Sequence, residues 1–153
     1  MKNLTEKIYK ELLLRNNVLL IGRADSGKTY YALNELIPFF NSKKLNTAYF
    51  PNCEGLLNVP DNTDIVIADE VETLVDKGFL EQQHPKDKPY YSSEYLERVK
   101  RWHNKLKIIQ KPAVFILTRS GEEEMEYLVD NVKKTDWGTP IECFVFENYK
   151  KLA

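Results

Sequence analysis

The segment with the most specific sequence in this chain is residues 22–29, Gly-Arg-Ala-Asp-Ser-Gly-Lys-Thr, which fits the phosphate-loop pattern G-x-x-x-x-G-K-[ST]. An apolar run at residues 18–21 enters the motif, and a helix-compatible stretch begins near Lys28. A loop of this kind turns backbone N–H groups around an anion, and the positive amino end of the following helix adds to the attraction. The pattern therefore predicts a strand, an anion-binding loop and a helix, in that order.

The loop residues have different expected roles. Gly22 and Gly27 provide backbone conformations that a Cβ would obstruct. Lys28 is placed to reach the β- and γ-phosphates of a nucleotide, and the Thr29 hydroxyl to bind Mg²⁺. One of the two tyrosines that follow either flanks the base or packs against the sheet, and the loop interior acts through its backbone. The residues expected to contact the nucleotide are Gly22, Arg23, Ala24, Asp25, Ser26, Gly27, Lys28, Thr29 and Tyr30.

Length and composition indicate one globular unit, so we expect residues 1–153 to form a single nucleotide-binding domain. A net charge of −1 provides no general attraction for nucleic acid or an anionic membrane. No apolar stretch has the length of a membrane span, and residues 1–7 turn polar too soon for a signal peptide. The two cysteines, without a CxxC pair, indicate reduced thiols in the cytoplasm.

Apolar periodicity predicts alternating strands and helices. Strands are expected at residues 18–21, 47–50, 64–68, 113–117 and 141–146. Helices are expected at residues 4–15, 28–40, 93–110 and 122–133, with Pro38 kinking or shortening the second. Residues 52–63 are expected to be irregular, and the polar, proline-containing segment 77–93 to be a mobile excursion. This alternation predicts an α/β fold, a three-layer sandwich with a mainly parallel five-stranded sheet that binds its ligand at the carboxyl ends of the strands.

A second group of polar residues lies at the end of the predicted third strand, where Asp69 and Glu70 follow four apolar residues. A carboxylate at the carboxyl end of a strand beside a phosphate loop can hold Mg²⁺, commonly through a water. We expect Asp69 to have that role, and Glu70 to orient and deprotonate an attacking water. The alternative is that both acids only solvate the end of a strand.

The two motifs together resemble those of the P-loop NTPases, in particular the additional-strand division that includes the AAA+ and RecA-like ATPases. Lys28 and Thr29 match the Walker A lysine and hydroxyl, and Asp69 and Glu70 match the Walker B aspartate and its adjacent catalytic glutamate. The resemblance implies ATP and Mg²⁺ as ligands, and no Asn-Lys-x-Asp sequence that would read guanine occurs in the chain. It covers nearly the whole chain as an architecture, although about a dozen residues carry the motifs.

The resemblance extends to the end of the predicted fourth strand, where Thr118 and Arg119 match the position that senses the γ-phosphate. Thr118 replaces the commoner asparagine there. Arg119 either stabilises charge on the γ-phosphate, in its own site or in that of a neighbouring subunit, or is a surface or salt-bridged arginine. Because the sequence ends soon after the fifth strand, we expect the C-terminal helical lid of most AAA+ proteins to be absent.

The helix expected at residues 93–110 is locally basic. Its cationic residues include Arg98, Lys100, Arg101, Lys105 and Lys107. They either contact a nucleic-acid backbone or form the solvated face that an amphipathic helix needs.

These features predict a Mg²⁺-dependent ATPase in which water accepts the phosphoryl group. Its candidate catalytic residues are Lys28, Glu70, Thr118 and Arg119, and its candidate metal ligands are Thr29 and Asp69. Such a protein would be a small motor or remodelling subunit that assembles with copies of itself and acts on nucleic acid or protein. Two other classes remain open. One is a small-molecule or nucleotide kinase, against which the lack of arginine in residues 121–137 argues, and the other is a nucleotide-gated binding module with little turnover.

Overall fold

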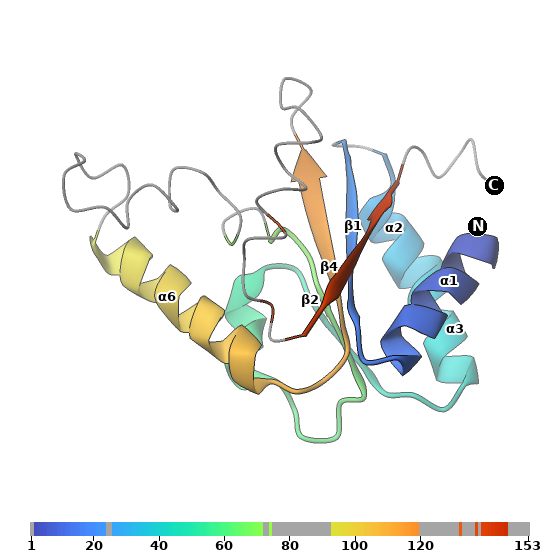
Figure 1. The fold of residues 1–153 in the computed structure, drawn as a ribbon, viewed down its shortest axis with the longest axis horizontal. Coiled ribbons are helices and arrows are strands. Elements are labelled where there is room, and N and C mark those ends of the chain that lie inside the picture. The colour runs from blue at the N-terminus through green and yellow to red at the C-terminus, as the bar shows by residue number, and fades with distance from the viewer. Residues whose placement is uncertain are drawn as a thin grey trace.

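The structure, a computed structural model, describes residues 2–23, 26–71, 74, 93–119, 132, 137 and 139–146. Its strands are β1 (Asn17–Arg23), β2 (Thr47–Phe50), β3 (Ile65–Ala68), β4 (Ala113–Arg119) and β5 (Ile141–Val145). They form one sheet in the order β2-β3-β4-β1-β5, in which every neighbouring pair is parallel. The carboxyl ends of these strands therefore lie at the same edge of the sheet, which is the upper edge in Figure 1.

Helices cover both faces of this sheet (Figure 1). On one face lie α1 (Lys2–Leu13) and a continuous helix made of α2 (Lys28–Tyr31), the π-helix η1 (Ala32–Leu36) and α3 (Ile37–Ser42). On the other lie the 3₁₀ helix η2 (Cys53–Asn58) and α6 (Ser93–Ile108). The expected α/β three-layer sandwich with a five-stranded parallel sheet is confirmed, and the arrangement is consistent with a P-loop NTPase-like fold.

Alternate residues of the central strands point to opposite faces of the sheet, and each set enters its own hydrophobic core. In β1, Leu19 and Ile21 belong to the core beneath α6, whereas Val18 and Leu20 belong to the core beneath α1, α2 and α3. All four side chains are fully buried. A strand that is covered on both faces needs apolar residues at consecutive positions, which explains the uninterrupted apolar runs of β1 and β3.

The helix after the loop passes Pro38 and continues to Ser42, so of the two predicted effects of Pro38, a kink or a shortening, the shortening is wrong. A proline inside an α-helix removes one hydrogen bond, and its ring clashes with the carbonyl four residues earlier. Here the preceding residues form a π-helix, in which the N–H of Ile37 donates to the carbonyl of Ala32, and Pro38 lies in the first turn of α3. The wider π-helical turn accommodates the proline within a continuous helix.

The other predicted elements that fall within the described residues agree with the observed bounds to within two residues. The exception is the segment expected to be irregular, which contains η2 (Cys53–Asn58). The side chain of Asn52 caps this short helix by accepting a hydrogen bond of 2.9 Å from the N–H of Glu54. The predicted helix at residues 122–133 and the predicted excursion at residues 77–93 lie almost entirely outside the described residues.

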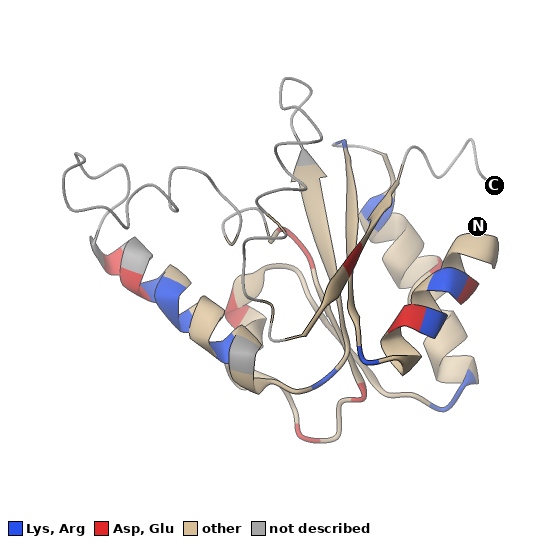
Figure 2. Cartoon of the chain, in the orientation of Figure 1, with Lys and Arg blue, Asp and Glu red and all other residues tan. Residues whose placement is uncertain are grey.

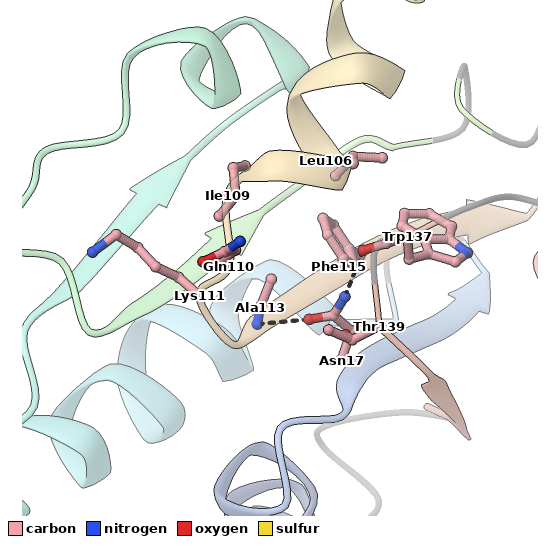
Figure 3. Close-up of a pocket in the computed structure, with 9 residues that line it drawn as sticks. All are labelled: Asn17, Leu106, Ile109, Gln110, Lys111, Ala113, Phe115, Trp137 and Thr139. Atoms are coloured by element: carbon pink, nitrogen blue, oxygen red, sulfur yellow. Dashed lines mark hydrogen bonds between the residues drawn. The ribbon is translucent and has the colours of Figure 1, made fainter.

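Asn17 connects three segments at the amino end of β1 (Figure 3). It is 4% exposed, its side-chain N–H donates to the carbonyl of Trp137 at 3.0 Å, and its side-chain oxygen accepts from the N–H of Ala113 at 3.1 Å. Its backbone N–H donates to the carbonyl of Pro140 at 2.8 Å. Asn17, Ala113 and Trp137, together with Phe115, border a cavity of about 40 Å³ at the opposite edge of the sheet from the carboxyl ends of the strands.

Asn17→Ala should lower the free energy of unfolding by about 2–4 kcal/mol, because the N–H of Ala113 and the carbonyl of Trp137 both lose a buried partner. Denaturant unfolding measures the change. Asn34→Ala is the control, since the Asn34 side chain bonds to the carbonyl of Tyr30 on the exposed helix surface, and its loss should cost under about 0.5 kcal/mol. Equal losses in the two variants would contradict a connecting role for Asn17.

Candidate functional site

The segment from the end of β1 to the start of α2 needs glycine at two positions for different reasons. Gly27 has a φ of 93°, in the left-handed region that other residues avoid, directly before α2 begins. Gly22 is crowded, because a Cβ there would overlap the backbone carbonyl of Phe146 just after β5. The interior loop residues Ala24 and Asp25, predicted to contact the nucleotide, lie outside the described residues.

Lys28 is folded back into this loop. The residue is only 4% exposed. Its Nζ donates to the carbonyl oxygens of Gly22 at 3.1 Å and Arg23 at 2.6 Å, and to Oγ of Ser26 at 3.2 Å. A buried ammonium group is stable only with acceptors of this kind, so the described part of the loop is organised around the Lys28 cation.

Asp69, the first residue after β3, is 5% exposed, and three donors contact its carboxylate. Oδ2 accepts hydrogen bonds from the Thr29 hydroxyl at 2.5 Å and from the Tyr49 hydroxyl at 2.9 Å. Oδ1 accepts from the N–H of Glu70 at 2.8 Å. The contact with Thr29 joins two residues that are 40 positions apart and that two separate motifs predicted as metal ligands.

Tyr49 is a residue of this site that sequence analysis missed. In the β2–β3 register it lies opposite Ile67, two residues before Asp69 and on the same face, so a long side chain on β2 reaches the carboxylate diagonally. Burial raises the pKa of Tyr49 well above its ordinary value, and the hydrogen bond to Asp69 and the charge of Asp69 raise it further. The hydroxyl therefore remains protonated and donates to Asp69. No sequence pattern distinguishes this tyrosine from an ordinary strand residue, because the register between two strands creates the contact.

Glu70 differs from Asp69 in both exposure and backbone conformation. It is exposed, and its φ of 52° lies in the left-handed region. The chain rejoins β4 at the next residue, where the N–H of Val71 donates to the carbonyl of Ile116 at 3.2 Å. Asp69 and Glu70 thus interrupt the β3–β4 ladder, which buries one carboxylate and leaves the other in solvent.

The predicted sensor residues lie at the same edge of the sheet. Thr118 is half-buried in β4, opposite Gly22 of β1. Arg119 is opposite Arg23 in the same register, and the side chain of Arg119 lies outside the described part of the structure. Because β4 pairs with both β1 and β3, Thr118 belongs to the strand between the loop and Asp69.

The two tyrosines after Thr29 have opposite environments. Tyr31 is fully buried, and its hydroxyl lies 2.6 Å from the hydroxyl of Thr5 in α1. Tyr30 is 57% exposed in the first turn of the helix that follows the loop. Tyr31 is therefore the tyrosine that packs in the core, and Tyr30 is the one exposed near the loop.

Acidic neighbours partly neutralise the basic face of α6 (Figure 2). Arg98 Nε lies 3.0 Å from Glu54 Oε1 of η2, and Lys100 Nζ lies 3.7 Å from Glu97 Oε1 on the same helix. Both ion pairs are exposed, so each contributes little to stability, but each reduces the positive charge available to a partner.

The other three residues of the predicted nucleic-acid surface differ from one another. Arg101 is exposed, Lys105 is half-buried, and the side chain of Lys107 lies outside the described part of the structure. A nucleic-acid contact along α6 therefore remains a prediction.

The oxygen atoms of Thr29 and Asp69 fit a hard divalent cation. Mg²⁺ prefers carboxylate, hydroxyl, phosphate and water oxygens, and proteins commonly hold it with one or two side chains together with substrate phosphates. Within the described ranges no group of three or more His, Cys, Asp or Glu side chains is suited to hold a metal. A cation beside Thr29 and Asp69 would therefore depend on additional oxygens from a phosphate ligand and water.

No protein-family model matches the sequence, and no curated protein matches it either. Among solved structures, one described as "crystal structure of DNA replication initiation factor" is similar, at 13% identity and a TM-score of 0.49. The similarity covers 93% of this chain and 44% of the other, so this chain spans less than half the length of that protein. At this identity and score the likeness carries no information on activity. None of the helices that the structure describes has the length and apolar character that a membrane crossing requires.

Gly27→Ala should lower the free energy of unfolding by about 1–2 kcal/mol, because alanine is strained at a φ of 93°. Gly27→Asn should lose less, since asparagine enters the left-handed region more readily. Denaturant unfolding of the wild type and both variants measures the difference. An alanine variant as stable as the wild type would show that the loop does not require this backbone conformation.

Proposed function

We propose that this protein binds a nucleoside triphosphate, ATP by preference, together with Mg²⁺ and hydrolyses it. The observation that carries the proposal is the hydrogen bond between Thr29 and Asp69. Thr29 lies in the first turn of α2, directly after the predicted phosphate loop, and Asp69 is a buried carboxylate at the end of a parallel strand. It brings two oxygen ligands suited to Mg²⁺ beside a loop and a helix start whose sequence is suited to phosphate. A magnesium–triphosphate complex needs this combination.

Lys28 supports the phosphate side of the proposal. The acceptors that the structure describes for its ammonium group include two loop carbonyls and one hydroxyl, which are uncharged. Hydrogen bonds from an ammonium group to charged phosphate oxygens are stronger than those to neutral acceptors. A triphosphate entering the loop would therefore compete successfully for the donors of Lys28.

Thr29 and Asp69 would hold the cation, through the hydroxyl oxygen and through the carboxylate or an intervening water. When bound, Mg²⁺ offsets the charge of the β- and γ-phosphates. Tyr30, exposed after the loop, would flank the base or ribose of the nucleotide.

The position of Glu70 supports hydrolysis in addition to binding. Its carboxylate is exposed next to Asp69, at the edge of the sheet where the loop lies. It would accept a proton from a water whose oxygen attacks the γ-phosphorus, while the bond from that phosphorus to the β–γ bridging oxygen breaks and ADP and phosphate leave. Thr118 would bond to the γ-phosphate, and Arg119 would add positive charge in this site or in that of a neighbouring copy.

Phosphate release by the purified protein tests the proposal and separates it from the other classes. Free phosphate formed from ATP and Mg²⁺ without an acceptor indicates hydrolysis, and stimulation by DNA, RNA or protein would indicate a motor or remodelling role. A requirement for an acceptor molecule would indicate a kinase. Tight nucleotide binding without turnover would indicate a nucleotide-gated module. A protein that neither binds nor hydrolyses ATP would overturn the proposal.

Lys28→Ala should lower the affinity for ATP with Mg²⁺ by about 30-fold or more, because removing one partner of a buried charged contact costs about 2–5 kcal/mol. Isothermal titration calorimetry measures the affinity. Lys10→Ala, at an exposed position of α1, is the control and should bind as the wild type does. Unchanged affinity in Lys28→Ala would count against the site.

Glu70→Gln should preserve nucleotide binding and lower turnover by about 100- to 10,000-fold, because the amide keeps the shape of the side chain but cannot accept the proton. Calorimetry measures binding, and steady-state phosphate release measures turnover. The control is Glu94→Gln, at an exposed position of α6. If Glu70→Gln hydrolyses ATP at the wild-type rate, Glu70 has no part in the reaction.

A further inference from the structure

Tyr49 is held in place beside Asp69 by both its ring and its backbone. Its ring packs against the core beneath α1, α2 and α3, and β2 pairs in parallel with β3. The N–H of Asp69 donates to the carbonyl of Phe50 at 2.8 Å, which extends that pairing by one residue beyond β3. Packing and strand pairing therefore fix the position of Tyr49, and a backbone hydrogen bond fixes that of Asp69. Together they maintain the distance of 2.9 Å between the Tyr49 hydroxyl and Asp69 Oδ2.

The hydroxyl groups of Tyr49 and Thr29 donate to the same oxygen of Asp69. Thr29 is itself a proposed cation ligand, so its oxygen acquires a second partner when the site is loaded. The backbone of Tyr49 pairs with β3 and its ring packs on the core, so its position does not depend on the loop. Its hydroxyl contacts the Asp69 carboxylate. Of the two hydroxyl groups that donate to Oδ2, it is the one that can maintain the orientation of Asp69 while the loop and Thr29 adapt to the nucleotide.

We propose that Tyr49 is a positioning residue of the cation site, which holds the Asp69 carboxylate in the orientation that binds Mg²⁺ with the triphosphate and so sets the affinity for the magnesium complex. This inference rests on the proposed function. A ligand whose orientation is fixed before binding loses less freedom on binding. Removal of such an outer partner of a metal ligand typically lowers metal affinity or activity by about 10- to 100-fold.

Tyr49→Phe tests the inference, because it removes the hydroxyl and keeps the ring. Calorimetry measures the affinity for a non-hydrolysable ATP analogue, once with Mg²⁺ and once with a chelator. The variant should bind the magnesium complex about 10-fold or more weakly, and should bind the metal-free analogue within about twofold of the wild type. The Mg²⁺ concentration for half-maximal turnover should rise by a similar factor.

Tyr31→Phe is the matched control. It also removes a tyrosine hydroxyl on the same face of the sheet, and this hydroxyl lies 2.6 Å from that of Thr5. Its affinity should equal that of the wild type under both conditions. In an Asp69→Asn background, Tyr49→Phe should have no further effect, because Tyr49 acts through Asp69.

Each outcome decides the inference. Equal losses of affinity with and without Mg²⁺ in Tyr49→Phe, or a full additional loss in the Asp69→Asn background, would overturn it. If the wild type binds the magnesium complex and Tyr49→Phe binds it equally well, the role of Tyr49 falls and the proposed function stands. If the wild type binds no analogue under either condition, the proposed function falls and the inference falls with it.

Discussion

A carboxylate removed from water needs hydrogen-bond donors around it, and in this protein Asp69 meets that need with donors from separate parts of the chain. They come from the helix after the loop, from β2 and from the backbone N–H of Glu70. Each donor is correctly placed only when the sheet has its parallel order and the helix crosses the face of that sheet. The contacts that would organise the cation site are therefore contacts that also stabilise the fold.

The strand order explains how the loop reaches this carboxylate. β1 and β3 are not neighbours, because β4 lies between them. The chain runs from β1 to β2 at the far edge of the sheet, so the connecting helix must cross the face of β4 and β3. Thr29, in the first turn of that helix, comes within hydrogen-bond distance of Asp69 although the two strands that carry the motifs are separated.

Features with local causes were predictable from the sequence. The apolar runs of β1 and β3 and the glycine-lysine loop led to correct elements in the correct order. The π-helix at Ala32–Leu36 and the 3₁₀ helix at Cys53–Asn58 were missed, because they differ from an α-helix or a turn in hydrogen bonding and not in apolar spacing. The pairing of Arg98 with Glu54 was also missed, since it depends on how α6 packs beside η2.

Local sequence accounts for the loop, for the alternation of strands and helices, and for the two acids that end β3. These features depend on residues that are adjacent in the sequence or separated by one repeat of a strand or of a helix, which is about two or about four residues. Three-dimensional packing alone makes Tyr49 a donor to Asp69 and leaves Glu70 in solvent. The reason is that strand register and helix crossing join residues 20 and 40 positions apart, and no local pattern contains that information.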